Sequence, residues 1–323
     1  QQSAVYRNAD AGSSATWNVV LSETGMYRTS LAIAPSNQNI IYASSANSSQ
    51  TDQPGLFAVF RSTSGGEANS WTAQVRGNST NKLNTVLFSW TLDAFYEDCK
   101  LGLGRFFNTG WYSNSIAVDP TDSNRVWVGG VDLFRSDDGG ANWGLASYSW
   151  LDSTAPQYAH AHHHKIVFPP QFDGRTNKTM IVAGDGGIYK TDDASAAVAT
   201  VSNAACDANL SAVRWHSLNN GYSATKLFHG AAFPNATSYL VGAEGHGFLI
   251  GSDAAGINGW KKVVAVDGGY VAIDPLRPNE LYTLSSGLLR KSSDGGQTFA
   301  FASLGLSLSG SIPVPPLLAD PSD

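Results

Sequence analysis

The sequence predicts an all-β fold made of repeated units of short strands, and three observations support this. The chain of 323 residues has only 14% charged residues, with 33 glycines and 11% aromatic residues, a composition typical of a β-rich protein with many tight turns. No long stretch keeps the i, i+3, i+4 apolar spacing of a helix. A pattern of three short apolar runs, separated by turns, recurs along the chain.

The clearest copy of this repeat covers residues 116–143. A first apolar run at 116–119 ends in a proline turn, a second run at 126–128 ends in a glycine turn, and a third run starts at Leu133. The other copies start at Leu31, Ile166, Ala231 and Val271. The shorter copies are ~40–50 residues long, which is the length of a four-stranded propeller blade.

Two copies close with a polar turn of the form Ser-x-Asp-x-Gly, followed by an aromatic residue. In this pattern the Asp carboxylate can accept N–H groups of its own turn, the Gly can supply a positive φ, and the aromatic side chain can pin the hairpin. The residues of the two turns are Ser136, Asp138, Gly140 and Trp143, and Ser292, Asp294, Gly296 and Phe299. Degraded versions begin at Asp10, Ser62 and Ser252, with a remnant at 191–193.

This polar turn resembles the Asp-box, or BNR repeat, of sialidases, sortilin-type receptors and xyloglucan-cleaving propellers. Residues 4–323 as a whole resemble exported bacterial BNR-repeat proteins often described as glycosyl hydrolases, through the segments 111–143, 158–189 and 218–282. The resemblance implies a β-propeller of about six four-stranded blades, or seven if the chain is a fragment, with Asp-boxes between third and fourth strands. Most members of that group have no assigned activity, so the resemblance leaves the activity open.

We expect a single propeller domain over residues 1–323, with insertions near 77–110 and 194–213 where the repeat spacing lengthens. One blade is shared between residues 1–20 and 312–323, or else the chain is truncated. Each insertion carries one of the two cysteines, Cys99 and Cys206. The two thiols either form one disulfide across the insertions or are both free.

Charge and hydropathy exclude two classes of partner. The net charge is −6 and the 20 basic residues are scattered singly, so no basic stripe is present for nucleic acid. The sequence has no apolar run of about 18 residues, so no membrane span is expected. The opening Gln1-Gln2-Ser3 suits a mature N-terminus, and we expect a secreted or cell-surface protein, either extracellular or periplasmic.

Propeller topology predicts where a site would lie. The first strand of each blade lines the central channel, so the segments that enter first strands and the links between second and third strands share one face, opposite the Asp-boxes. The entry segments supply Arg28, Tyr112, Asn114, His160, His162, His163, His164, His229, Asp267 and Tyr270. The links supply Asp132, Asp185, Glu244 and His246.

The favoured hypothesis is a non-catalytic extracellular propeller that binds a glycan or a protein on this face. Its candidate ligand-binding residues are Arg28, Tyr112, Asn114, His229, His246 and Tyr270. Aromatic residues that could stack on sugar rings, or else pack between blades, are Trp111, Tyr112, Trp150 and Tyr270.

Two alternatives remain open at this point. A glycoside hydrolase needs two carboxylates, for which the candidates are Asp132, Asp185, Glu244 and Asp267; a sialidase is disfavoured because Arg28 is the only arginine on the face. The other alternative is a structural module of a cell-surface assembly.

The histidine run at 160–164 raises the question of a metal cofactor. In an extended segment His160, His162 and His164 would share one face and could bind a divalent metal ion such as zinc. Otherwise they form a polar lining of the channel. No other cofactor is indicated.

Overall fold

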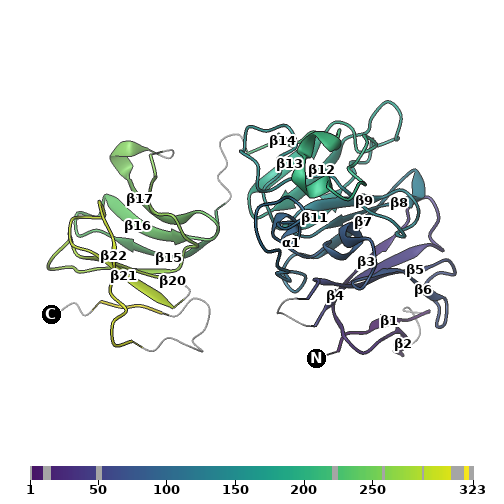
Figure 1. Cartoon of the computed structure of the whole chain (residues 1–323), viewed down its shortest axis with the longest axis horizontal. Helices are drawn as coiled ribbons and strands as arrows, with labels where there is room; N and C mark the ends of the chain where they lie inside the picture. The colour runs from purple at the N-terminus through teal and green to yellow at the C-terminus, as the bar shows by residue number, and fades with distance from the viewer. Residues whose placement is uncertain are drawn as a thin grey trace. The chain divides into compact units, whose positions relative to one another are not determined.

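The computed structural model describes residues 2–9, 16–48, 53–219, 225–256, 259–285, 287–306 and 316–319. The chain divides into two compact units, Gln1–Ala224 and Thr225–Asp323. Figure 1 shows the sheets that make up each unit. The expected union of both units in one propeller domain stays a prediction.

Both units consist of small antiparallel sheets. The first unit contains a two-stranded sheet of β1 (Val5–Arg7) and β2 (Asn18–Leu21). Its four-stranded sheets are β3 (Met26–Ile33), β4 (Ile41–Asn47), β5 (Leu56–Ser62) and β6 (Trp71–Arg76); β7 (Ser115–Asp119), β8 (Asp122–Gly129), β9 (Leu133–Ser136) and β10 (Gly144–Leu145); and β11 (His163–Val167), β12 (Met180–Gly184), β13 (Gly187–Thr191) and β14 (His216–Ser217).

The second unit contains two further four-stranded sheets. They are β15 (Leu227–Ala232), β16 (Ser238–Ala243), β17 (Gly247–Ser252) and β18 (Lys261–Val264); and β19 (Tyr270–Ile273), β20 (Leu281–Ser285), β21 (Leu288–Ser292) and β22 (Ala300–Phe301). Helical segments are short in both units: α1 (Thr91–Ala94), η1 (Lys82–Thr85), η2 (Ala204–Cys206), η3 (Ala208–Leu210) and η4 (Asp253–Ala255). None of the helices in the described residues is long and apolar enough to cross a membrane.

The four-stranded sheets are propeller blades. In each one the strands follow chain order and pair with their neighbours in antiparallel register, and the five repeat starts predicted from the sequence all lie in first strands. Within the first unit β7 packs between β3 and β11, and within the second unit β15 packs beside β19. First strands are therefore neighbours, as in a propeller, and the predicted fold class is confirmed.

The blade count differs in one respect from the prediction. Five sheets have four strands, whereas the sheet at the start of the chain has two, β1 and β2. Residues 316–319, from the segment expected to complete this blade, form no strand, and 312–315 and 320–323 lie outside the described residues. The shared blade stays a prediction.

The two Ser-x-Asp-x-Gly turns lie between third and fourth strands, at the predicted place. In the first turn Asp138 Oδ1 accepts the N–H groups of Ala141 (3.0 Å) and Asn142 (2.9 Å). Gly140, at φ 95°, donates its N–H to Ser136 Oγ over 2.9 Å. Trp143 is buried and donates from Nε1 to the Gly140 carbonyl, so the turn and its aromatic pin form one unit.

The second turn repeats this geometry between β21 and β22. Asp294 Oδ1 accepts the N–H groups of Gln297 and Thr298, both over 2.9 Å. The degraded turn at Ser62 keeps the bonds to the serine hydroxyl, from the N–H groups of Ser64 (3.3 Å) and Gly66 (3.0 Å). The degraded turn at Asp10 falls on residues 10–15, outside the described residues.

The insertion near 77–110 is part of the core of the first unit. Leu83, Phe88 and Phe95 are fully buried within it. A disulfide joins Cys99 in this insertion to Cys206 in the other one, across a sequence separation of 107. Of the two alternatives for the cysteines, the structure therefore has the bridge.

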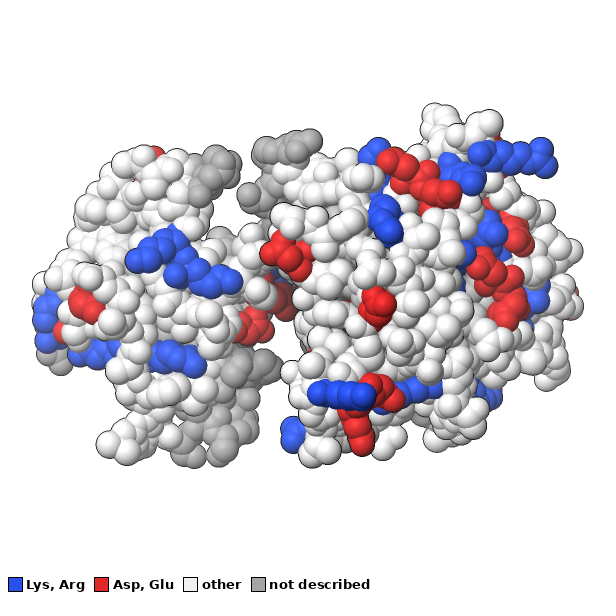
Figure 2. All heavy atoms as spheres, turned by 45° about the horizontal axis from the view of Figure 1, so that its top comes forward, with Lys and Arg blue, Asp and Glu red and all other residues white. Residues whose placement is uncertain are grey.

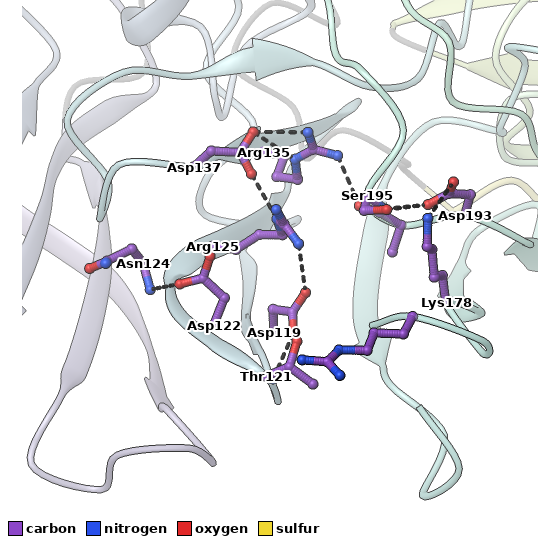
Figure 3. A network of polar contacts seen from close by, with 12 residues as sticks. Asp119, Thr121, Asp122, Asn124, Arg125, Arg135, Asp137, Lys178, Asp193 and Ser195 are labelled. Carbon is purple, nitrogen blue, oxygen red and sulfur yellow. Dashed lines mark hydrogen bonds and ion pairs between the residues drawn. The ribbon is translucent and has the colours of Figure 1, made fainter. Parts of the chain in front are cut away.

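A charged network joins the β7–β10 blade to the insertion near 194–213 (Figure 3). Arg125 and Arg135 both bond to Asp137, each with a shortest distance of 2.8 Å. Arg135 is buried and also donates to the carbonyls of Ala194 (2.8 Å) and Ala196 (2.6 Å). Because each buried charge has a partner, we assign the network a structural role.

Candidate ligand-binding site

A pocket of about 410 Å³ opens beside α1 in the first unit, lined by Trp90, Asp93 and Phe107. Trp90 is the N-cap residue of α1, and Asp93 lies within the helix. The Phe107 side chain is 45% exposed. The pocket thus combines two aromatic walls with one carboxylate.

The segment that enters β7 extends this aromatic surface. Trp111 is 52% exposed, and its ring centroid lies 5.5 Å from that of Tyr112. Arg28 Nη1 donates to the Trp111 carbonyl over 3.2 Å and also to the Tyr112 carbonyl. Arg28 therefore holds the aromatic segment in place from β3.

Tyr112 reaches a carboxylate on the next blade. Its hydroxyl donates to both oxygens of Asp185, each over 3.0 Å, and Asp185 Oδ1 also accepts from His164 Nε2 over 2.7 Å. Burial acts to raise the pKa of Asp185, but the hydrogen bonds from His164 and Tyr112 outweigh it and hold that pKa below its ordinary value. Asp185 is thus kept ionised by its partners.

His162 joins the pocket to this carboxylate. Its ring stands edge-on to Trp90, at 5.3 Å between centroids, and at the same distance from Tyr112. Its Nδ1 lies 3.2 Å from Ser113 Oγ. We use the name aromatic site for the resulting cluster of Trp90, Asp93, Phe107, Trp111, Tyr112, His162, His164 and Asp185.

The pKa values of the two carboxylates of the aromatic site are shifted in opposite directions. Burial raises the pKa of Asp93, whereas the hydrogen bonds described above lower that of Asp185. Asp93 was not among the sequence candidates because it lies in an insertion, where the blade repeat gives no register. The sequence signal that could have pointed to this part of the site is the group of aromatic residues within 90–96.

One predicted catalytic residue and one predicted ligand-binding residue are buried instead of facing the channel. Asp132 is fully buried, because the tight link at 130–132 turns its side chain inward, where Oδ1 accepts the Ser149 N–H over 2.8 Å. Asn114 is also buried and donates to the carbonyls of Arg28 (3.0 Å) and Ser44 (3.2 Å). Asn114 therefore ties β7 to β3 and β4.

The histidine run is not extended over its whole length, because only His163 and His164 lie in a strand, β11. His162 has φ 67°, which breaks the alternation of side chains, and the ring of His160 contacts the backbone of Ala161 through Nδ1 (3.1 Å). In the part of the chain that the structure describes, no three His, Cys, Asp or Glu side chains are grouped as metal ligands. The predicted three-histidine metal site is not assembled there.

The remaining predicted residues form a second group in the second unit. Tyr270 stacks on His229, with ring centroids 4.5 Å apart. Glu244 is ion-paired with Lys226 over 2.6 Å, and Asp267 Oδ1 caps the turn at 244–247 by accepting the Gly245 N–H over 2.7 Å. His246 Nδ1 lies 2.9 Å from the Glu244 carbonyl.

Trp150, one of the predicted stacking residues, packs edge-on against Tyr148 at 5.2 Å and packs against the core of the first unit.

Most of the described surface visible in Figure 2 is uncharged, with Lys, Arg, Asp and Glu side chains interspersed.

No family model matches the chain, and no curated protein matches it in sequence. Among solved structures it is similar to a GH74 enzyme from Niastella koreensis (17% identity, TM-score 0.33, covering 84% of this chain and 37% of that chain). It is also similar to the GH74 xyloglucanase from Xanthomonas campestris (19% identity, TM-score 0.33, covering 84% of this chain and 38% of that chain). A third similar structure is YCF48 from Cyanidioschyzon merolae (13% identity, TM-score 0.32, covering 95% of this chain and 80% of that chain). This chain thus spans 37% and 38% of the two GH74 chains, and the fold assignment rests on its own strand pairing.

Proposed function

We propose that this protein is a ligand-binding β-propeller protein of the Asp-box type and that it takes a neutral carbohydrate at the aromatic site. The observation that carries the proposal is the pocket lined by Trp90, Phe107 and Asp93. Ring contacts through His162 and Tyr112 connect Trp90 to the exposed ring of Trp111. Flat aromatic faces pack against the C–H faces of sugar rings, and a few placed polar groups fix their orientation.

The polar groups of the site favour a neutral sugar over an acidic one. Asp185 is held ionised by Tyr112 and His164, and it can accept hydrogen bonds from sugar hydroxyls. A carboxylate of the ligand would be repelled by Asp185. Arg28, the arginine that contacts the aromatic segment, already donates to its backbone carbonyls.

A glycan array with neutral and acidic oligosaccharides tests the ligand class. We expect binding to neutral oligosaccharides and weak or no binding to sialylated and uronic-acid glycans. Preference for acidic glycans, or no glycan binding together with binding of an unstructured peptide library, would contradict the proposal and favour a protein ligand.

A glycoside hydrolase is a second candidate, and the opposite pKa shifts of Asp93 and Asp185 favour it. A carboxyl with a raised pKa suits a general acid, and an ionised partner suits a base or nucleophile. If the site cleaves glycans, Asp93→Asn and Asp185→Asn should each lower the release of reducing ends at least a hundredfold, by analogy with the loss of one acid–base group.

Asp152→Asn provides a matched control, because Asp152 is an exposed acid of the same unit that bonds only within its own turn. It should leave the release of reducing ends unchanged. Equal activity in the wild type and both site variants would remove the hydrolase candidate and leave the binding function intact.

The location that fits this function is outside the cytoplasm, either secreted or on the cell surface. The disulfide between Cys99 and Cys206 supports an oxidising compartment, because disulfides are rare in reducing ones. Both the Asp-box assignment and the location are part of the proposal.

A further inference from the structure

The link between β8 and β9, residues 130–132, touches one wall of the aromatic site through its backbone. The N–H of His162 donates to the Val131 carbonyl over 3.1 Å, and the N–H of His163 donates to the Gly130 carbonyl over 2.8 Å. The Gly130 N–H closes the link by donating to the Asp132 carbonyl over 3.0 Å. The position of the link therefore sets the position of the His162 wall.

The side chain of Asp132 connects the same link to the other wall, which is α1. The Oδ2 atom of Asp132 is buried without a hydrogen-bond partner, and so are the hydroxyl oxygens of Thr91 and Ser149. These two hydroxyls nevertheless lie near enough to Asp132 to act on its ionisation. Thr91 is the first residue of α1, directly after Trp90, so the carboxyl with its unpaired Oδ2 atom lies beside the start of the helix that bears the pocket.

A neutral carboxyl fits this position better than an ionised one. A protonated acid can donate to a hydroxyl oxygen, whereas a buried carboxylate needs a cation or several donors. Burial raises the pKa of Asp132 to about 6, against the opposing effect of the Thr91 and Ser149 hydroxyls and the Ser149 N–H.

The titratable groups on the elements packed around Asp132 are Tyr148, Asp93, His162 and His163. Burial raises the pKa of Tyr148 and of Asp93, and burial lowers that of His163 to about 3. Around neutral pH the Tyr148 phenol and the His163 imidazole are therefore uncharged, and neither supplies a positive charge to an ionised Asp132.

We propose that Asp132 is a pH-responsive positioning residue, which is protonated when α1 is held against the His162 wall and releases α1 when it ionises. The walls of the aromatic site are then closed in mildly acidic solution and loosened at neutral pH. The proposal rests on the proposed function only in naming these walls a binding site.

The direction of the pH effect follows from the linkage between proton binding by Asp132 and the opening of α1. The folded state binds the Asp132 proton more tightly than an open state in which the carboxyl has its ordinary pKa of 3.8. Opening therefore becomes easier as pH rises through about 6. Between pH 5 and pH 7.5 the opening equilibrium should shift by about tenfold.

Hydrogen–deuterium exchange of the segment 88–97, corrected for the intrinsic pH dependence of exchange, tests this on the full chain without ligand. Wild type should exchange this segment about tenfold faster at pH 7.5 than at pH 5. Asp132→Asn, whose amide can donate to Thr91 Oγ1 at any pH, should give equal protection at both pH values. The control Asp152→Asn should behave as wild type.

Thr91→Val is the second variant, and it removes the hydroxyl that faces Asp132. It should exchange the 88–97 segment rapidly at both pH values while β7 and β8 stay protected. A pH-independent wild type, or an Asp132→Asn variant that keeps the wild-type pH dependence, would overturn the proposal. Because no ligand is used, either result is independent of whether the site binds a carbohydrate.

Discussion

At the scale of single residues, a fully buried histidine beside the aromatic site should make the stability of the protein depend on pH. His163 is 1% exposed, and neither ring nitrogen has a hydrogen-bond partner. Burial, together with the neighbouring histidines His162, His160 and His164, lowers its pKa to about 3. The native state therefore holds this ring neutral, while the unfolded chain protonates it near pH 6.5.

The contribution of His163 to the free energy of unfolding should accordingly fall as pH drops from 6.5 towards 3. At pH 4 the loss attributable to His163 amounts to about 3 kcal/mol. His163→Leu should remove this loss and be nearly neutral at pH 7.5, because it replaces a polar ring without partners. Denaturant unfolding at pH 4 and pH 7.5 measures the difference.

His216→Gln is the matched control, because the His216 side chain is 55% exposed. It should keep the wild-type pH dependence. An equal fall in stability for wild type and His163→Leu would contradict the assignment of the acid sensitivity to this ring.

Some residue-level predictions from the sequence agree with the structure and others do not. The difference depends on whether the direction of the side chain is set by the blade topology or by the local backbone. Topology placed Tyr112, His164 and Asp185 on one face, and the structure brings them into hydrogen-bonding contact. It could not show that the link at 130–132 turns Asp132 inward, because the direction of a side chain in a tight link depends on the local backbone. The kink at His162, with φ 67°, was equally invisible in the sequence.

At the scale of elements, the blades and the positions of the insertions were predictable, and the paths of the insertions were not. Alternating apolar runs and the Ser-x-Asp-x-Gly turns are local signals, so the first strands and the turns at Asp138 and Asp294 could be located in the sequence. The pocket residues Trp90, Asp93 and Phe107 belong to a segment without a repeat, whose path is set by tertiary packing.

The disulfide between the two insertions gives a prediction at this scale. The bridge closes a loop with a sequence separation of 107, and in the chain-entropy model such a loop contributes up to about 5 kcal/mol to stability. The double variant Cys99→Ser, Cys206→Ser should therefore lose about 2–5 kcal/mol in denaturant unfolding. It should also lose exchange protection in the site-bearing insertion.

Reductant serves as the control. It should destabilise the wild type to the level of the double variant and leave the double variant unchanged. If wild type is equally stable with and without reductant, the bridge does not constrain the insertions.

At the scale of the whole molecule, the polar turns of the blades and the segments that bear the aromatic site have separate tasks. The buried serine and the aromatic pin of the first polar turn, Ser136 and Trp143, hold strands together, and the charged network around Asp137 anchors an insertion. The exposed aromatic residues of the aromatic site, Trp111 and Phe107, lie instead on the segment that enters β7 and on the insertion near 77–110. This division supports a binding function that uses the blades as a scaffold.

The central claim is that the aromatic site binds the ligand, and calorimetric titration tests it most directly. The titrant is the neutral oligosaccharide that binds best on the array, and the proteins are wild type, Trp111→Ala and Trp17→Ala. Both tryptophans are exposed, by 52% and 61%, and Trp17 lies outside the aromatic site. Trp111→Ala should weaken binding by about tenfold to a hundredfold, equivalent to the burial of one large apolar side chain, and Trp17→Ala should bind as wild type. Unchanged affinity in Trp111→Ala, or an equal loss in both variants, would contradict the account.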